Sequence, residues 1–323
     1  MKKKVAIITG GNVAEREVSL KSAATIHKHL NKDRYETYVI ELEGTDFLEQ
    51  SNRTVIDKND FSLPVPDGKN IYFDFVFLML HGHPAEDGCL QGYFEVLNIP
   101  YSGCDHFVSA LTFNKQVCKD YLRPFQIPMA KSELIYKSKA IDEPALKALG
   151  LPLFVKPNKN GSSYGITKVN NFDEIKGATE KAFQFDEEVI VEQFLEGREF
   201  SNGVVRKGDE LVVFPVTEII TKNDFFDFKA KYENESEEVT PANLTPVLQK
   251  QVQELSLKLY EDLNCKGLVR FDTILVGDTF HFLEANTIPG FSEQSLFPQQ
   301  ARAHGWTIEE LLDCVVEESL KDA

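Results

Sequence analysis

Apolar and polar positions in the first hundred residues follow two alternating patterns. Short apolar runs at 5–8 and 73–80 predict buried strands, and 35–42 alternates like a strand. Residues 17–30 and 90–97 carry apolar residues at helical spacing. Strands that alternate with helices indicate a parallel sheet covered by helices. We therefore expect the first domain to have an α/β fold.

The middle of the chain mixes helices with strands that form hairpins. The predicted elements are, in order, a helix at 111–125, strands at 153–157 and 166–169, a helix at 172–185 and a strand at 188–192. Hairpins that pack on helices are typical of an α+β layer. We expect this second domain to differ in architecture from the first.

The last part of the chain predicts two hairpins, two helices and one long polar stretch. The hairpins pair 200–206 with 210–215 and 268–276 with 279–284, and the helices lie at 247–263 and 306–320. Residues 221–245 are polar and irregular, and so long a stretch in a compact protein is usually functional, such as a lid. The whole pattern predicts three domains, at 1–108, 109–197 and 198–323.

The composition limits the classes of function. The 323-residue chain has a formal net charge of −16, which argues against a duplex nucleic-acid binder because such proteins need a basic face. No apolar run approaches the roughly 20 residues of a membrane span. Five cysteines without CxxC spacing argue against a disulfide framework and a cysteine zinc site. We expect a cytoplasmic protein without nucleic-acid or membrane partners.

Two glycine-containing loops are candidates for phosphate contacts. Gly10-Gly11, with Glu41 at the end of the next strand, matches half of a dinucleotide-binding fingerprint, but the absence of GxGxxG favours a plain turn. Lys156 precedes a glycine- and serine-rich loop that either wraps phosphate oxygens or forms a solvated hairpin turn. A Walker NTPase is not expected, because the chain has no GxxxxGK[ST] segment.

The strongest cluster of chemical groups lies in the second hairpin of the last domain. Arg270 and Asp272 share one face of a strand, and so do Glu284 and Asn286, because side chains alternate along a strand. If the strands pair, two carboxylates and an amide oxygen form a site suited to Mg²⁺. Arg270 can then neutralise an anionic oxygen. The alternative is a solvent-facing strand pair with salt bridges.

Two further loops follow predicted strands. His81 begins a loop at the carboxyl end of a parallel strand, where α/β proteins form their sites. The His81-Gly82-His83 spacing favours hydrogen-bonding or structural roles over metal binding. The loop at 287–296 follows the Glu284–Asn286 segment and is a candidate site for a carboxylate.

In their order along nearly the whole chain, these motifs resemble those of the D-alanine–D-alanine ligases of the ATP-grasp superfamily. The matching segments are EVSL at 17–20, HG and EDG within 81–88, GSS and G within 161–165, and the RxD and ExN pairs within 270–286. Two residues depart from the family pattern. Ala85 stands where the family usually has glycine, and Gln193 stands where many members have lysine. The resemblance implies an ATP-grasp fold, with a parallel α/β domain and two α+β domains that clamp ATP.

The resemblance also implies roles for individual residues. Substrate contacts are Glu17 at the amine of the first D-alanine, His81, and Gly290 and Ser295 at the carboxylate of the second. ATP contacts are Lys115, Lys156, Ser162, Ser163, Glu192, Gln193, Leu195, Glu199 and Lys231. Two Mg²⁺ ions, with Mn²⁺ as a substitute, are assigned to Asp272, Glu284 and Asn286. The implied catalytic residues are Glu17, Ser162, Arg270 and Tyr232.

The activity implied is ATP-dependent ligation of two D-alanine molecules through D-alanyl phosphate, for peptidoglycan precursor synthesis. Alternatives are ligases that make D-alanyl-D-lactate or D-alanyl-D-serine, and other ATP-grasp carboxylate–amine ligases. Tyr232 favours the dipeptide, because members that favour the ester often lack this tyrosine. The resemblance also implies a homodimer. An alternative of another class is a nucleotide-binding protein whose site is Gly10-Gly11 and Glu41.

Overall fold

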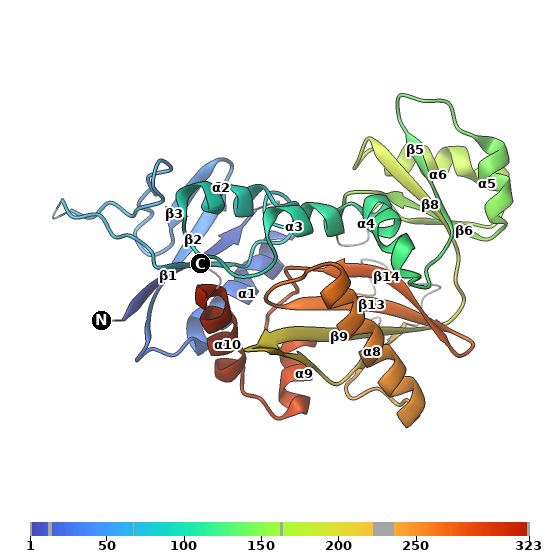
Figure 1. Ribbon diagram of the computed structural model, residues 1–323. Helices are drawn as coiled ribbons and strands as arrows, with labels where there is room; N and C mark the ends of the chain where they lie inside the picture. Colours follow the sequence, from blue (N-terminus) through green and yellow to red (C-terminus); the bar gives the residue numbers. More distant parts are fainter. Residues whose placement is uncertain (1, 12–14, 67, 162–163, 222–235, 322–323) are drawn as a thin grey trace.

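The computed structural model describes residues 2–11, 15–66, 68–161, 164–221 and 236–321. Within these residues the strands form three sheets, which follow one another along the chain (Figure 1). Helices α3 and α4 run between the first and second sheets, and the third sheet lies below them in the same view (Figure 1).

The N-terminal sheet has the strand order β3-β2-β1-β4. Strands β2 and β4 pair in parallel with β1, as predicted, and β3 adds an antiparallel edge that the sequence pattern did not predict. The elements are β1 (Lys3–Gly10), α1 (Arg16–His29), β2 (Tyr35–Glu43), β3 (Asp46–Glu49), β4 (Phe75–Leu78) and α2 (Cys89–Leu97). Strands β1 and β4 are buried almost throughout, which explains their continuous apolar runs.

The single helix predicted at 111–125 is wrong, because the structure has two helices there. Helix α3 (His106–Phe113) ends at Asn114, and α4 (Lys115–Leu122) begins directly after it, followed by the 3₁₀ turn η1 (Arg123–Phe125). Asn114 has an extended backbone, and its side chain accepts a hydrogen bond from the backbone N–H of Val117. It therefore caps α4 and turns the chain between the two helices.

The second sheet is antiparallel, with the order β5-β8-β6-β7. Its elements are β5 (Ser132–Tyr136), α5 (Glu143–Leu149), β6 (Leu153–Pro157), β7 (Thr167–Val169), η2 (Phe172–Glu174), α6 (Ile175–Ala182) and β8 (Glu188–Gln193). Both helices pack on the sheet through a small apolar core. The predicted strands and the helix at 172–185 are confirmed, whereas β5 and α5 were not predicted.

The third sheet has the order β12-β11-β9-β13-β14, with β10 paired to β9. Its elements are β9 (Arg198–Lys207), β10 (Glu210–Val213), β11 (Thr217–Thr221), β12 (Ser236–Val239), α8 (Pro246–Asp262), β13 (Val269–Val276) and β14 (Thr279–Asn286). Both predicted hairpins are confirmed as antiparallel pairs. Strand β12 corrects the prediction that 221–245 is irregular throughout, because it pairs with β11.

The closing helix returns to the first domain. Helices α9 (Leu296–His304) and α10 (Ile308–Lys321) follow the third sheet. The apolar face of α10, including Leu311 and Val315, belongs to the same core as strands β1 and β4. Figure 1 shows α10 beside α1. Among the described helices, none combines the length and apolar character needed to cross a membrane.

Candidate active site

A cavity of about 660 Å³ receives side chains from all three parts of the chain. A pocket of this size is in the range that holds small-molecule substrates and cofactors. Nine of the predicted site residues line it: His81, Lys115, Lys156, Arg270, Asp272, Glu284, Asn286, Gly290 and Ser295. The structure therefore brings together residues that lie up to about two hundred positions apart in sequence.

The predicted cluster on the second hairpin forms one continuous polar face of this cavity. Strand register places Arg270 opposite Asn286 and Asp272 opposite Glu284. Asp272 accepts two hydrogen bonds from the Arg270 guanidinium, at 3.0 and 2.9 Å, and one from the Asn286 amide at 2.9 Å. The Ser201 hydroxyl donates a fourth at 2.7 Å. Hydrogen bonds from three side chains of the protein thus fix the position of the Asp272 carboxylate.

The donor set of this face is suited to a hard divalent cation. Asp272, Glu284 and Asn286 all line the cavity and offer carboxylate and amide oxygens. Mg²⁺ prefers such oxygen ligands over nitrogen or sulfur. The residues present therefore fit the metal that the sequence analysis assigned to them.

The two predicted phosphate lysines face the cavity from separate elements. Lys115 is the first residue of α4, and its ammonium donates to the backbone carbonyl of Asn160 at 2.8 Å. Lys156 lies on β6 and forms an ion pair with Glu192 of β8. Both lysines are thus held beside the loop that follows β6.

Glu192 lies between two lysines in the interior. One carboxylate oxygen contacts Lys156 and the other contacts Lys119 of α4 at 2.6 Å. Burial favours the neutral acid, but the two ammonium groups outweigh it and hold the pKa of Glu192 at about 2. Burial lowers the pKa of Lys119, whereas the attraction of Glu192 overcomes burial and raises the pKa of Lys156. Lys119 was not predicted as a site residue.

We expect replacement of Glu192 by glutamine to lower the free energy of unfolding by about 3–5 kcal/mol, because it removes the carboxylate that pairs directly with two buried ammonium groups. The contribution of Glu192 is present above pH 4.5, its ordinary pKa, and is lost as the pH falls through about 2. Urea unfolding at neutral pH measures the loss. Glu143→Gln, in an exposed pair with Lys147, is the matched control and should change stability by less than about 1 kcal/mol. Equal losses in the two variants would contradict the prediction.

Glu17, the residue expected at the substrate amine, does not line the cavity. Its side chain is 81% exposed and pairs with Lys21 one turn along α1, at 3.2 Å. Glu15 lines the cavity instead. A Cβ on Gly82 or Gly161 would lie 2.6 or 2.7 Å from its carboxylate oxygens, so this carboxylate sits tightly between two glycine backbones.

Helix α1 also anchors two loops of the cavity. The Ser19 hydroxyl accepts from the backbone N–H of His81 at 3.0 Å, and the Ser22 hydroxyl accepts from that of Phe291 at 2.9 Å. The ring of His81 is buried, with Nδ1 3.7 Å from the Glu86 carboxylate. Ala85, the departure in the same loop, is buried and has no positive φ, so its backbone does not require glycine.

Gly290 and Ser295 lie together in the cavity wall, where a Cβ on Gly290 would be 3.3 Å from the Ser295 hydroxyl. The Ser295 hydroxyl accepts from the backbone N–H of Ser292 at 3.0 Å and is 2.8 Å from its hydroxyl. Ser295 is the N-cap residue of α9, so the free N–H groups of that helix also begin here. Backbone and hydroxyl donors at a helix N-terminus are suited to an anionic group such as a carboxylate.

Four predicted ATP contacts among the described residues do not line the cavity. Glu192 and Gln193 end β8, Leu195 follows them, and Glu199 lies at the start of β9, on the connection between the second and third sheets. Glu192 reaches the cavity only through Lys156. Four other predicted residues lie outside the described residues: Ser162, Ser163, Lys231 and Tyr232.

The alternative site at Gly10 and Glu41 is occupied by structural contacts. Glu41 is buried and paired with Arg16 and Arg53. A Cβ on Gly10, whose φ is 93°, would lie 2.6 Å from the Leu42 carbonyl oxygen, so glycine serves the close packing of a turn. The simpler interpretation, a plain βα turn, is the one that the structure supports.

Family models extend the match beyond single residues. The model described as the D-ala D-ala ligase N-terminus matches residues 4–104, and the one described as the D-ala D-ala ligase C-terminus matches residues 122–317. The chain belongs to the D-alanine–D-alanine ligase family. A D-alanine–D-alanine ligase from Phocaeicola vulgatus is 43% identical over 322 residues, covering 98% of this chain and 99% of the relative.

Solved structures of this family confirm the predicted ATP-grasp architecture. The VanG D-Ala:D-Ser ligase from Enterococcus faecalis aligns with a TM-score of 0.88 and 32% identity, covering 99% of this chain and all of that chain. A D-alanine–D-alanine ligase from Bacillus anthracis, complexed with ATP, aligns with a TM-score of 0.82 and 29% identity, covering 99% of this chain and 98% of that chain. The predicted fold class, with one α/β and two α+β domains, is confirmed, although the first sheet is mixed.

Proposed function

We propose that the protein is an ATP-dependent ligase that joins two D-alanine molecules into D-alanyl-D-alanine, a precursor of peptidoglycan. The observation that carries the proposal is the strand register that sets Arg270 and Asp272 opposite Asn286 and Glu284 on the cavity wall. Family membership supports the same reaction, and the similar Bacillus anthracis ligase complexed with ATP supports ATP as the phosphoryl donor.

The chemistry requires an activated carboxylate. An oxygen of the first D-alanine attacks the γ-phosphorus of ATP, which forms D-alanyl phosphate and releases ADP. The ammonium groups of Lys115 and Lys156 are placed to hold the phosphate oxygens during this step. Glu15, rather than Glu17, pairs with the ammonium of this substrate.

The second D-alanine then attacks the activated carbonyl carbon. Its carboxylate is bound by Ser295 and the adjacent backbone, which turns its amine toward the intermediate. Arg270, with the backbone N–H of Gly290, stabilises the negative charge that develops on the carbonyl oxygen. Collapse of this tetrahedral species expels phosphate and leaves the dipeptide.

Asp272, Glu284 and Asn286 would hold Mg²⁺ in this reaction. When bound, Mg²⁺ supplies positive charge that screens the phosphate oxygens of ATP. The roles of Ser162, Lys231 and Tyr232, the contacts of Gln193, Leu195 and Glu199, and the homodimer remain predictions.

The proposal is tested by phosphate release from Mg·ATP with and without D-alanine, with mass spectrometry of the product. We expect release that depends strictly on D-alanine and yields one dipeptide per phosphate. Release without dependence on D-alanine, or no release in protein that binds ATP, would overturn the assigned substrate.

A second candidate product is D-alanyl-D-serine, because the VanG structure named for D-Ala:D-Ser ligation aligns over nearly the whole chain. Competition between D-alanine and D-serine or D-lactate, at equal concentrations and neutral pH, distinguishes the products. We expect the dipeptide of two D-alanines to exceed the others at least tenfold.

A further inference from the structure

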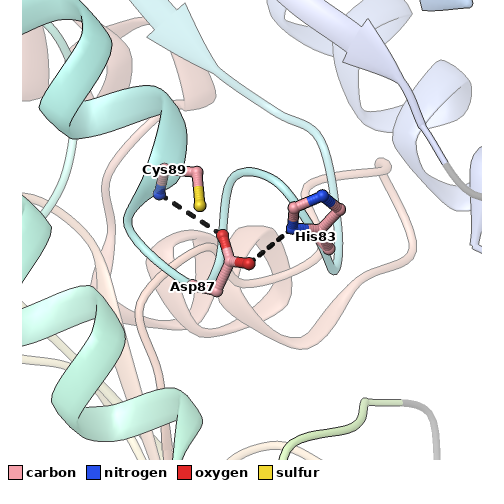
Figure 2. Close-up of side chains that lie close together, drawn as sticks. All are labelled: His83, Asp87 and Cys89. Carbon is pink, nitrogen blue, oxygen red and sulfur yellow. Dashed lines mark hydrogen bonds and ion pairs between the residues drawn. The ribbon is translucent and has the colours of Figure 1, made fainter. Parts of the chain in front are cut away.

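Three potential metal ligands converge on the outer side of the loop that carries His81. The Nδ1 atom of His83 is 2.5 Å from one oxygen of Asp87, and the other oxygen of Asp87 accepts from the backbone N–H of Cys89 at 3.3 Å. One ligand atom from each of these three side chains lies within 4.8 Å of the others. Figure 2 shows the Asp87 carboxylate between the His83 ring and the Cys89 side chain.

The three side chains are outside the cavity already described. His83 and Cys89 are exposed, Asp87 is partly buried, and none of the three lines the cavity. The same loop sends His81 and Glu86 inward to the cavity wall. The loop therefore has an inner face toward the cavity and an outer face whose nitrogen, oxygen and sulfur groups do not line it.

The backbone that carries these ligands is fixed by hydrogen bonds. The N–H groups of Ala85 and Glu86 both donate to the Gly82 carbonyl, at 3.0 and 2.9 Å. The Gln91 amide donates to the Ala85 carbonyl at 2.7 Å. Gly88 has a φ of 87°, and a Cβ there would lie 2.4 Å from the His106 carbonyl oxygen, so the chain turns tightly just before Cys89. These contacts hold the backbone that carries the three ligand residues in one conformation.

The geometry points to a second metal site, formed by His83, Asp87 and Cys89, which takes a borderline-soft divalent ion of the Zn²⁺ class. Zn²⁺ is bound by cysteine sulfur at about 2.3 Å and by histidine nitrogen and carboxylate oxygen at about 2.0–2.2 Å, with four ligands in a tetrahedron. Three ligands come from the protein, and a water completes the set. A hard ion such as Mg²⁺ is disfavoured by the nitrogen and sulfur donors.

Charge supports the same choice. The Asp87 carboxylate beside Cys89 attracts a divalent cation, and Cys89 loses its proton to solvent as the metal–sulfur bond forms. The formal charge of −16 adds a favourable field for cations.

Occupancy of this site would brace the loop that carries His81 and Glu86. The absence of CxxC spacing argues against a zinc site built from several cysteines, and the His81-Gly82-His83 spacing argues against one built from those two histidines. Neither argument applies to His83 joined by Asp87 and Cys89. The site does not depend on the proposed function, because its ligands and its readout are separate from the ligase reaction.

Co²⁺ is the probe, because its thiolate complexes absorb in the near ultraviolet whereas all-oxygen complexes do not. The full chain is titrated with Co²⁺ in a phosphine reductant and excess Mg²⁺. We expect one equivalent to bind with a thiolate-to-cobalt band, Zn²⁺ to displace it, and Zn²⁺ to raise the melting temperature. Absence of the band in folded protein would overturn the proposal.

Variants identify the ligands. Cys89→Ser should remove the band, and His83→Ala should weaken Co²⁺ binding at least tenfold. His106→Ala is the matched control, because His106 forms a similar exposed pair with Glu95 at 2.6 Å, and it should leave binding unchanged. A band that survives in Cys89→Ser, or equal binding in His83→Ala and the wild type, would overturn the site. Melting temperatures of the metal-free variants show that they remain folded.

Discussion

Replacement of Arg270 by alanine should reduce kcat for D-alanine-dependent phosphate release by about 10²–10³-fold, the range found when a donor to a developing oxyanion is removed. The Arg270 guanidinium lies on the cavity wall and donates two hydrogen bonds to the Asp272 carboxylate. Its loss removes positive charge where the carbonyl oxygen becomes negative and also frees one side of the Asp272 carboxylate. Steady-state kinetics with D-alanine and Mg·ATP measure the effect.

Arg198→Ala is the matched control. Arg198 also makes a two-point contact with a carboxylate in the same sheet, Glu218, at 2.7 and 2.8 Å, but it does not line the cavity. We expect kcat within about twofold of the wild type, because neither member of this pair lines the cavity. A near-normal rate for Arg270→Ala, or an equal loss in both variants, would contradict the role assigned to Arg270.

Replacement of Glu15 by glutamine should lower kcat/KM for D-alanine by about 10- to 150-fold, equivalent to about 1.5–3 kcal/mol for a hydrogen bond to a charged group. Glutamine keeps the size of the side chain between Gly82 and Gly161 but removes the charge that pairs with the substrate ammonium. The measurement is the dependence of phosphate release on D-alanine concentration at saturating ATP.

Glu17→Gln tests the sequence-based assignment in the same experiment. Its side chain is exposed and contacts Lys21 on the helix surface, so we expect kcat/KM within about twofold of the wild type. The reverse result, a large loss for Glu17→Gln and none for Glu15→Gln, would restore the assignment from sequence.

The positions of Glu15 and Glu17 around α1 show how the sequence could have distinguished them. Residues 15 and 17 differ by about 200° around a helix, so they lie on opposite faces. Ser19 and Ser22 continue the face of Glu15, and both are buried, whereas Lys21 continues the face of Glu17. The sequence did contain a signal for Glu15. Two serines on the buried side of a helix indicate that this helix face contacts polar loops.

The polar cluster on the β13–β14 hairpin was predictable because it follows from two rules that act over a few neighbouring residues. Alternation places residues two apart on one face, and a short turn fixes the pairing of adjacent strands. The structure keeps this pairing through Arg270–Asn286 and Asp272–Glu284, and the register shifts only after Asp272. Fold class was predictable for a similar reason, since each element was identified from its own apolar spacing.

Contacts between distant segments were not predictable in this way. Glu192 meets Lys119 across 73 positions, and no spacing rule connects them. The break at Asn114 depends on one capping side chain within a continuous apolar pattern. Helix α9 was not predicted. Its first turn contains Pro298, which is tolerated at that position, but the sequence gives no clear boundary between α9 and the loop before it.

The return of α10 to the first sheet has a consequence for the order in which this protein is made. Strands β1 and β4 leave the ribosome early, yet their core includes Leu311 and Val315 of α10. Until residues 308–321 have been synthesised, apolar surface on the nascent first domain lacks its final cover. The N-terminal domain therefore cannot complete this core until α10 has been synthesised, and a fragment cut at residue 108 would lack the cover that α10 supplies.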